Sequence, residues 1–390
     1  MRIGIVGYGT AGQAAAIFLA RAGHAVEVFE QSPQLRPVGA GFLLQPTGLG
    51  VLAALGLDGG AFACGARIER LHGETTSGRT VMDMRYADHA PDCFGLGMTR
   101  GALFELLHRC AGSLASVRTG ARIVAVDARA GTLDEASGVR HGPYDLVVVA
   151  DGAHSALRAQ GGIAQRDPVY PWGAVWCLLP ADDWPHAAEL RQRYDGTRTM
   201  IGALPVGLRP DDAQRRWLTY FFSLPGEQVE SFDAPALARM HAEVARVWPE
   251  LVPLVRAIDE PAKLNRARYR DVVLRCPWRG RAVCIGDAAH AMSPQLGQGV
   301  NMALLDALAL ADALAHHPRL DEALAHYARS RAGHLAVYQR LSRWLTPLFQ
   351  SDHVVLGKLR DIAFGPSGRL PFARGQMLKI LTGTKRGWLR

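Results

Sequence analysis

The hydrophobic pattern of the N-terminal residues predicts a strand, a helix and a second strand. Residues 3–6 form a short apolar run, and residues 25–30 (AVEVFE) form another. Between them, residues 11–22 are rich in alanine and carry bulky apolar side chains, which favours a helix. Gly23 follows and is typical of a helix end. A strand–helix–strand opening predicts a parallel sheet.

The pattern changes in the middle of the chain. Strand-like runs, separated by Pro and Gly, surround one helix-like segment at 234–247, which predicts an antiparallel sheet with a covering helix. The predicted strands of this region are 174–179, 200–206, 217–224 and 272–274. Further on, the pattern returns to a strand at 282–285 and a long helix at 301–314. We therefore expect an α/β fold: a doubly wound, parallel-sheet, Rossmann-like domain with an inserted, mainly antiparallel β domain and a helical C-terminal tail.

The composition is that of a globular protein with an unevenly placed charge. The chain has 390 residues, 48% hydrophobic and 21% charged, with a net charge of +8. Residues 331–390 hold eleven Lys and Arg but only two acids, so the rest of the chain is close to neutral. A basic tail without a recognised nucleic-acid motif argues against a nucleic-acid partner.

The cysteines and the N-terminus bear on location. The six cysteines include no CxxC pair, which argues against a zinc site and a dithiol centre, and we predict no metal site. Buried thiols in a reducing compartment are the simpler interpretation. The N-terminal MRIGIVGYG enters the first strand directly, so we expect no secretory signal and a cytoplasmic location. The sequence also lacks a run of apolar residues typical of a transmembrane helix.

The first motif is a GxGxxG turn between the first strand and the first helix. Gly7 permits the tight turn, Gly9 lets a pyrophosphate approach the backbone, and Gly12 permits close packing of helix on strand. The helix N-terminus then presents free N–H groups to the phosphates. Glu30, at the end of the second strand, is placed to accept hydrogen bonds from a ribose. The pattern predicts dinucleotide binding, without choosing between NAD and FAD.

Two further motifs follow strand-like runs elsewhere in the chain. Residues 144–158 read YDLVVVADGAHSALR, with Asp151-Gly152 directly after an apolar run. Residues 281–306 read RAVCIGDAAHAMSPQLGQGVNMALLD, with Gly286-Asp287 after another apolar run and a glycine-rich loop before a helix. In order, spacing and context, the three stretches resemble the GxGxxG, DG and GD motifs of the single-component FAD-dependent (class A) aromatic monooxygenases, the family of para-hydroxybenzoate hydroxylase. The resemblance covers roughly residues 1–330.

The resemblance implies a domain division and a cofactor site. It implies an FAD-binding domain of residues 1–72, 96–166 and 276–335, a substrate domain of residues 73–95 and 167–275, and a C-terminal helical and basic segment of residues 336–390. It implies that non-covalent FAD contacts Gly7, Gly9, Ala11, Gly12, Glu30, Arg36, Arg100, Asp151, Arg158, Gly286, Asp287, Gly299, Val300 and Asn301.

Within that set, the resemblance implies individual roles. Glu30 would hold the adenosine ribose, and Arg36 would lie near the pyrophosphate. Arg100 would open a helix beside the cofactor. Asp151 and Arg158 belong to a segment that contacts both FAD and NAD(P)H in the family. Asp287 would bind the ribityl or pyrophosphate portion, although as a residue next to a helix start it has a rival interpretation as an N-cap for Ala289 and His290.

The loop before the last motif helix is the candidate catalytic element. Pro294 fixes the loop, while Gly297 and Gly299 leave room for a flat ring. The helix N-terminus that follows would stabilise negative charge on a reduced flavin. His290 is interpreted as structural or cofactor-proximal, with general-base catalysis as the alternative. We assign Pro294, Gly297 and Gly299 as the candidate catalytic residues.

Aromatic residues of the inserted domain are candidates for the substrate pocket. Trp172 and Trp176 share strand parity, as do Tyr220 and Phe222, so each pair faces one side of its strand. The competing interpretation is that these aromatics belong to the core.

The resemblance implies the hydroxylation of an electron-rich aromatic or related small molecule with NAD(P)H and O₂, through a C4a-hydroperoxyflavin. A second GxGxxG is absent from the sequence, which favours transient NAD(P)H binding or reduction by a partner protein. The alternatives are a flavin-dependent oxidase or dehydrogenase and a flavin-loaded binding protein. For the basic tail, docking on the protein and peripheral membrane contact through Trp388, Leu389 and nearby cations are both open.

Overall fold

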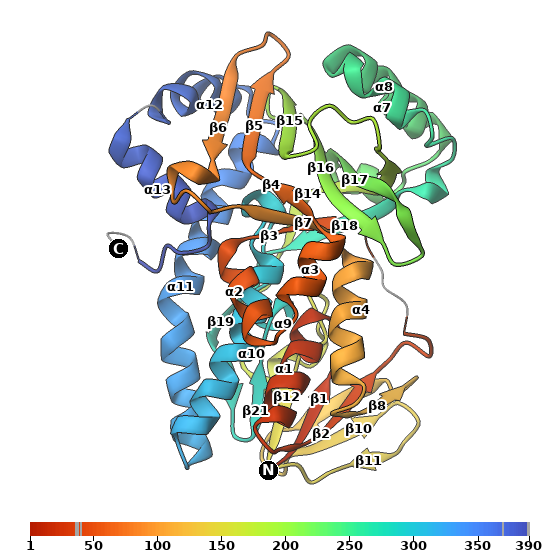
Figure 1. The fold of residues 1–390 in the computed structure, drawn as a ribbon. Helices are drawn as coiled ribbons and strands as arrows, with labels where there is room; N and C mark the ends of the chain where they lie inside the picture. The colour runs from red at the N-terminus through yellow and green to blue at the C-terminus, as the bar shows by residue number, and fades with distance from the viewer. Residues whose placement is uncertain (36–38, 40, 369, 388–390) are drawn as a thin grey trace.

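The computed structural model describes residues 1–35, 39, 41–368 and 370–387 (Figure 1). Its first sheet, hereafter the parallel sheet, has the strand order β20–β21–β12–β1–β2–β8. β1 (Arg2–Val6) pairs in parallel with both β2 (Ala25–Glu30) and β12 (Leu146–Val149). The helix α1 (Thr10–Arg21) joins β1 to β2. The predicted strand–helix–strand opening is therefore confirmed.

The two faces of the parallel sheet are covered differently. Helices α1, α4 (Arg100–Ala111) and α10 (Gly299–His316) bury an apolar cluster on one face. On the other face, side chains such as Val147 and Phe29 pack against a small antiparallel sheet of β9 (Ile123–Asp127), β10 (Thr132–Glu135) and β11 (Arg140–His141). The sheet is thus buried on both sides, as its continuous apolar strands require.

The second sheet, hereafter the inserted sheet, has seven strands in the order β18–β14–β17–β16–β15–β5–β6. The β15–β5 pair is parallel and the other pairs are antiparallel, which confirms the mainly antiparallel prediction. Helix α7 (Ala234–Val247) has the bounds expected from the sequence and covers one face, together with α8 (Val252–Val255). The strands are β5 (Arg70–Thr75), β6 (Thr80–Arg85), β14 (Val169–Pro180), β15 (Glu189–Asp195), β16 (Thr199–Arg209), β17 (Asp212–Pro225) and β18 (Asn265–Arg270).

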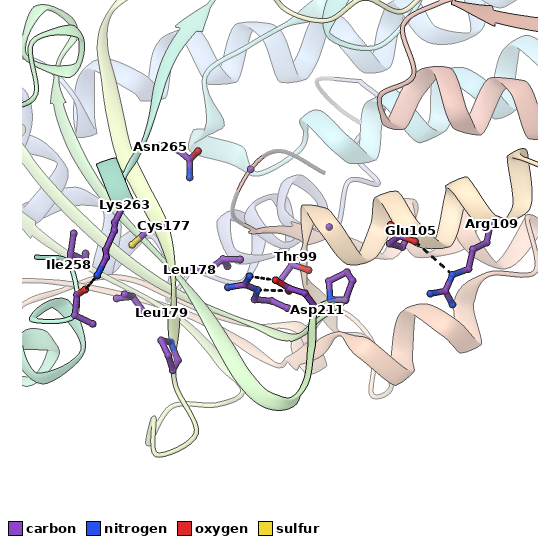
Figure 2. A pocket seen from close by; sticks show the side chains of 16 residues that line it. Thr99, Glu105, Arg109, Cys177, Leu178, Leu179, Asp211, Ile258, Lys263 and Asn265 are labelled. Atoms are coloured by element: carbon purple, nitrogen blue, oxygen red, sulfur yellow. Dashed lines mark hydrogen bonds and ion pairs between the residues drawn. The ribbon is translucent and has the colours of Figure 1, made fainter. Parts of the chain in front are cut away.

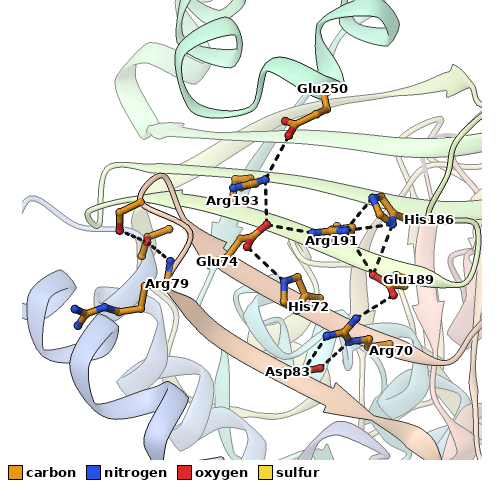
Figure 3. Close-up of polar contacts among 12 residues, drawn as sticks. Arg70, His72, Glu74, Arg79, Asp83, His186, Glu189, Arg191, Arg193 and Glu250 are labelled. Atoms are coloured by element: carbon orange, nitrogen blue, oxygen red, sulfur yellow. Dashed lines mark hydrogen bonds and ion pairs between the residues drawn. The ribbon is translucent and has the colours of Figure 1, made fainter.

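The strand β15 was missed by the sequence pattern because its sequence, ELRQRYD, is largely charged. Its charged side chains form ion pairs across neighbouring strands (Figure 3), while Leu190 and Tyr194 pack in apolar clusters. Arg191 and Arg193 both reach Glu74 on β5, at 3.1 and 3.0 Å. Glu189 pairs with Arg70 at 3.2 Å. Cross-strand opposite charges of this kind support strand pairing where hydrophobicity does not.

Several domain boundaries expected from the sequence fall inside elements of the structure. The boundary after residue 95 cuts β7 (Gly95–Thr99), the one after residue 275 cuts β19 (Val273–Cys276), and the one after residue 335 cuts α11 (Leu320–Phe349). β5 begins at Arg70 and belongs to the inserted sheet, so the division placed after residue 72 falls inside a strand. The division moves to the residues before Arg70. Between the two large sheets lie two smaller ones, β3–β7–β4 and the pair β13–β19.

The C-terminal segment is helical, as predicted. It comprises the C-terminal part of α11 (Leu320–Phe349), then α12 (Val354–Ser367) and α13 (Pro371–Leu381). By length and composition α10 alone among the described helices is apolar enough to cross a membrane, and half of it is buried inside the protein. Burial of this extent is typical of a helix in the core of a protein, so we interpret α10 as a core helix. The remaining elements are α2 (Pro46–Ala54), α3 (Asp58–Cys64), α5 (Arg158–Gly161), α6 (Gly226–Glu230), α9 (Asp287–His290), β3 (Gly41–Leu44), β4 (Ala66–Ile68), β7 (Gly95–Thr99), β8 (Ser116–Thr119), β13 (Ile163–Arg166), β19 (Val273–Cys276), β20 (Trp278–Arg279) and β21 (Ala282–Cys284).

Candidate active site

The glycines of the first motif differ in how much space a side chain would have. A Cβ atom on Gly7, whose φ is +100°, would lie 2.4 Å from the Ala150 carbonyl oxygen. One on Gly12 would lie 2.0 Å from the Gly7 carbonyl oxygen. A Cβ on Gly9 would meet no atom within 4 Å. Gly7 and Gly12 are therefore required by packing, while Gly9 faces open space in which a ligand can approach the backbone.

Glu30 supports the glycine turn from the end of β2. Its Oε2 accepts a hydrogen bond from the Tyr8 amide at 2.9 Å, and its Oε1 accepts one from the Ser32 amide at 2.8 Å. These contacts fix the half-buried carboxylate at the rim of the turn. Each oxygen keeps a further lone pair for a ribose hydroxyl.

The second motif follows β12 directly. Gly152 has φ +88°, and a Cβ there would meet no atom within 4 Å. Burial raises the pKa of Asp151, and its Oδ1 is buried without a hydrogen-bond partner among the described residues. A buried, unsatisfied oxygen of this kind is costly unless a ligand donates to it. Gly152 thus faces open space, and the neighbouring Asp151 has a carboxylate oxygen without a partner among the described residues.

Arg158 is directed into the protein and not towards this surface. Its side chain is 3% exposed. Nε donates to the Ala288 carbonyl at 2.8 Å, Nη2 donates to the Ala153 carbonyl at 2.6 Å, and Nη1 pairs with Asp167. Arg158 therefore ties the second motif to the third, and the contact of its segment with FAD and NAD(P)H stays a prediction.

The third motif places Asp287 on the surface. Asp287 is exposed at the first position of α9, and the amides of Ala289 and His290 bond to the Gly286 carbonyl oxygen. The N-cap interpretation of Asp287 is therefore wrong, and its carboxylate remains available to a ligand. Gly286 has φ +59°, and a Cβ there would lie 2.8 Å from the Ala11 Cβ. Gly286 and Ala11 thus join the third motif to the first.

His290 belongs to a buried polar chain behind the motif. It is 1% exposed, and its Nε2 lies 2.5 Å from Oδ2 of Asp306. Oδ1 of Asp306 accepts from Nε of Arg331 at 2.7 Å. Burial by itself raises the pKa of Asp306, but His290 and Arg331 outweigh it and hold that pKa well below its usual value. This geometry favours the structural role of His290 over general-base catalysis.

The glycine-rich loop before α10 is held from behind by two buried amide side chains. Asn301, 0% exposed, accepts from the Gln45 amide at 2.8 Å and donates to the Gly297 carbonyl at 3.1 Å. Gln298 donates to the Leu381 carbonyl, just before the chain leaves α13, at 2.8 Å. The side chain of Asn301 therefore positions the loop, and its predicted contact with FAD stays a prediction.

The front of this loop is open. Pro294 and Gly297 are exposed, and Gly299 and Val300 are half-buried. Gly297 is left-handed at φ +60°, and a Cβ there would meet no atom within 4 Å. The first amides of α10 have no partner within the helix and carry the positive end of its dipole. The loop thus offers N–H groups and an unobstructed backbone to a flat, anionic group.

Arg100 and Trp176 meet the loop that contains the predicted pyrophosphate arginine. Arg36 itself lies outside the described residues. A Cβ on Gly39 would lie 2.1 Å from Cδ of Arg100 and 3.1 Å from Cη2 of Trp176. Arg100 is exposed at the start of α4, where Thr99 caps the helix by accepting from the Ala102 amide. The structure therefore brings Arg100 and Trp176 together at the junction of the two domains.

A cavity of about 860 Å³ opens at the same junction (Figure 2). Gly39, Thr99 and Gly101 contribute from the first domain, and residues 177–180 contribute from β14. Its charged side chains are already paired, as Arg209 is with Asp211. A mixed apolar and polar lining of this size is typical of small-molecule sites.

The other aromatic candidates are not at this junction. Tyr220 and Phe222 are 0% and 5% exposed and pack in the apolar core beneath α7. Their predicted substrate role is therefore corrected to a core role, because that face of the sheet is turned to α7. Trp172 is 3% exposed on β14, and its substrate role stays a prediction.

Sequence reasoning missed the residues that support these loops. Gln45, Gln298, Asp306 and Arg331 are all buried and act through partners distant in the sequence. Gln298 stands inside the GQG stretch, but its partners lie on α13. Pattern and spacing carry no signal for such long-range contacts.

The described residues fit an extended dinucleotide. The open glycine positions follow β1 and β12, which are neighbours in the parallel sheet, and precede α10, which packs on α1. Ligands of parallel sheets bind at this carboxyl edge of the strands. All six cysteines are free thiols, and no metal-binding group of His, Cys, Asp or Glu occurs among the described residues.

Comparisons with known proteins agree with this site. A family model described as FAD binding domain matches residues 1–340. Kynurenine 3-monooxygenase of Salinispora arenicola is 33% identical over 380 residues, covering 87% of this chain and 78% of that protein. A probable 2-heptyl-3-hydroxy-4(1H)-quinolone synthase of Rhodococcus erythropolis is 29% identical over 347 residues, covering 87% of this chain and 86% of that protein. The solved structure of Klebsiella pneumoniae HpxO complexed with FAD and uric acid has a TM-score of 0.83 at 21% identity, covering 98% of this chain and 96% of that one.

The fold and the three motif loops define a flavoprotein of the FAD-binding-domain class. Within that class, the chain belongs to the FAD-dependent aromatic monooxygenases related to para-hydroxybenzoate hydroxylase. Its cofactor is FAD, with NAD(P)H as the co-substrate of the family.

Proposed function

We propose that this enzyme hydroxylates an electron-rich aromatic ring, a phenol or an N-heteroaromatic, at the junction of its two domains. The observation that carries the proposal is the open loop from Pro294 to Gly299, which faces away from its buried supports. When bound, FAD would accept a hydride from NAD(P)H and activate O₂ so that one oxygen atom can be transferred.

The residues of this chain orient and stabilise the reacting groups. The first amides of α10, at Gly299 and Val300, favour negative charge on a ring placed against them. Asn301 and Gln298 keep the loop in place for this task, and Gly297 leaves the ring unobstructed. Asp287 and Glu30 are assigned to the ribityl and ribose hydroxyls respectively. The inserted sheet is assigned the exclusion of water from the reacting atoms.

The substrate is assigned to the cavity between Thr99 and β14. The support for this assignment is that both domains line the cavity and that Trp176 reaches Gly39. The printed names of relatives include a kynurenine and a heptyl-quinolone enzyme, and both ligands contain an electron-rich ring. We therefore expect substrates of this chemical class.

Product analysis tests the proposal. Purified enzyme is incubated with NAD(P)H, ¹⁸O-labelled O₂ and a panel of hydroxybenzoates, aminobenzoates and alkylquinolones. The proposal expects one class of compound to gain one labelled oxygen atom while accelerating NAD(P)H oxidation. Substrate oxidation without incorporated label would favour a flavin-dependent oxidase or dehydrogenase. Turnover only with an added reductase would favour a partner-reduced flavoprotein.

We also propose a cytoplasmic enzyme whose C-terminal segment contacts anionic membranes peripherally. Trp388 and Leu389, which suggested this contact, lie outside the described residues. Support comes instead from the α12 stripe, which we define as Val354, Val355, Leu359 and Ile362, exposed by 63%, 68%, 54% and 61%. Exposed Lys358 lies within this stripe, and the surrounding segment is strongly basic. A lipophilic substrate would explain such a surface.

A further inference from the structure

A second cavity, of about 650 Å³, lies between α11 and the strand pair β13–β19. Arginine dominates the described residues that line it, and neither Asp nor Glu is among them. The arginines come from three separate elements, so the sequence did not group them. They are Arg166, Arg275, Arg329, Arg331, Arg340 and Arg343.

The charge of this arginine cavity is only partly neutralised from behind. Asp271, 2% exposed, pairs with Arg166 at 2.6 Å and with Arg343 at 2.8 Å. Asp306 pairs with Arg331 at 2.7 Å. The two buried carboxylates thus pair with three of the cavity's arginines, whereas Arg275 and Arg329 are exposed. The cavity therefore attracts anions, and several of its cations extend into solvent.

The floor of the arginine cavity belongs to the third motif. Ala289 and His290 line it, two and three residues after Asp287. Nε2 of His290 is held by Asp306, whereas Nδ1 is buried without a hydrogen-bond partner among the described residues. The short helix α9 therefore faces the cavity with one side and presents exposed Asp287 at its start. An anion in the cavity would therefore lie against α9, the helix that begins with Asp287.

The enzyme must neutralise the phosphates of NAD(P)H somewhere. The sequence offers no second GxGxxG, and Arg158, the arginine expected to contact this co-substrate, has its three nitrogens bonded within the protein. Guanidinium groups bind phosphate oxygens in pairs, with charge-assisted hydrogen bonds. The arginine cavity is large enough for part of a dinucleotide and has the required charge.

We propose that the arginine cavity binds the phosphate-bearing part of NAD(P)H. The proposal rests on the monooxygenase function and adds a location for the co-substrate. It assigns Arg275 and Arg329, which are exposed on β19 and α11, to the phosphates. Arg331 and Arg343 form the inner wall, where ion pairs with Asp306 and Asp271 hold them in place.

Stopped-flow flavin reduction tests the proposal on the full-length holoenzyme. The double variant R275A/R329A removes two exposed cations of the cavity. R122A/R129A is the matched control, because both arginines are exposed and lie around β9, outside the cavity. We expect the Kd for NAD(P)H to rise about tenfold or more in R275A/R329A, with the limiting reduction rate unchanged. R275K/R329K should recover part of the loss.

Further measurements distinguish phosphate recognition in the arginine cavity from a general loss of structure or of hydroxylation. Inorganic pyrophosphate should compete with NAD(P)H in the wild type and less in R275A/R329A, which identifies phosphate recognition. Hydroxylation after reduction by dithionite should be equal in the wild type and R275A/R329A. An unchanged Kd, the same rise in R122A/R129A, or a loss in the dithionite arm confined to the cavity variant would each overturn the proposal. A wild type that is reduced by dithionite yet never hydroxylates would instead contradict the monooxygenase function.

Discussion

At the scale of single residues, some glycines of the first motif are required by packing and one faces open space. Gly7 and Gly12 have neighbours that leave no room for a side chain, whereas Gly9 faces open space. Gly9 also has φ −74°, a conformation open to any residue. Its glycine is therefore explained by the approach of a ligand and not by the fold.

This contrast predicts opposite results for G9A and G12A. G9A should leave the unfolding free energy of the FAD-free protein within about 0.5 kcal/mol of wild type. Its FAD affinity should fall about tenfold or more, because the added methyl group blocks the pyrophosphate approach. G12A should cost about 1–3 kcal/mol in stability through overpacking against Gly7. Denaturant unfolding and FAD titration check both, and wild-type FAD affinity in G9A would contradict the assignment.

Residue roles were predictable where chemistry is local and not where it is long-range. The spacing of Gly7, Gly9 and Gly12 specified their duties because a turn and a helix start are local structures. The side chain of Arg158 looked like a ligand contact in sequence, but carbonyls and a carboxylate brought near it by the fold enclose it. Tyr220 and Phe222 were misassigned because parity shows that two residues share a face, not which face meets the site.

At the scale of elements, the C-terminal helices are joined to the flavin loop. α13 accepts the hydrogen bonds of Gln298, and the Thr382 carbonyl lies 3.4 Å from the hydroxyl of Thr47 at the start of α2. His334 on α11 adds a third contact: its Nε2 lies 2.8 Å from the Gly383 carbonyl oxygen, and its Nδ1 lies 3.0 Å from Nη1 of Arg331. Both contacts are satisfied by a neutral imidazole with the proton on Nε2.

His334 therefore makes this junction sensitive to acid. Burial, followed by the charge of Arg331, lowers its pKa from 6.5 to about 4. The folded state thus favours the neutral form, and the corresponding stability is present above pH 6.5 and is lost as pH falls towards 4. The loss is at most about 3 kcal/mol. H334Q keeps a donor and an acceptor without titrating, so its unfolding free energy should fall less than that of wild type between these pH values. Parallel curves would contradict the prediction.

The α12 stripe leads to a prediction about membranes. Wild-type protein should co-sediment with phosphatidylglycerol vesicles more than with phosphatidylcholine vesicles. L359Q/I362Q should weaken this binding about tenfold or more. V124Q/V139Q is the matched control, since Val124 and Val139 are also exposed, by 43% and 50%, but lie by the small sheet β9–β10–β11. Equal binding by the two double variants would contradict a membrane role. Self-association of the wild type that L359Q/I362Q abolishes would assign the stripe to a second copy.

At the scale of the whole molecule, the parallel sheet and the inserted sheet lie towards opposite ends of the protein (Figure 1). The strand–helix alternation of the first domain and the α7 segment were predictable, because their hydrophobic periods are regular. β15 was not, because most of its residues are charged and pair across neighbouring strands. Nor was the arginine cavity, whose residues converge only when α11 packs beside β19.

The central claim is that this fold holds FAD for an NAD(P)H-driven hydroxylation that depends on substrate. The most direct measurement is the absorption spectrum of the purified protein, followed by NAD(P)H oxidation and O₂ consumption with and without aromatic ligands. The account predicts a bound-FAD spectrum and a strong, ligand-dependent acceleration of both rates, with hydroxylated product. A protein that binds no FAD, or whose flavin NAD(P)H never reduces with any ligand, would contradict it.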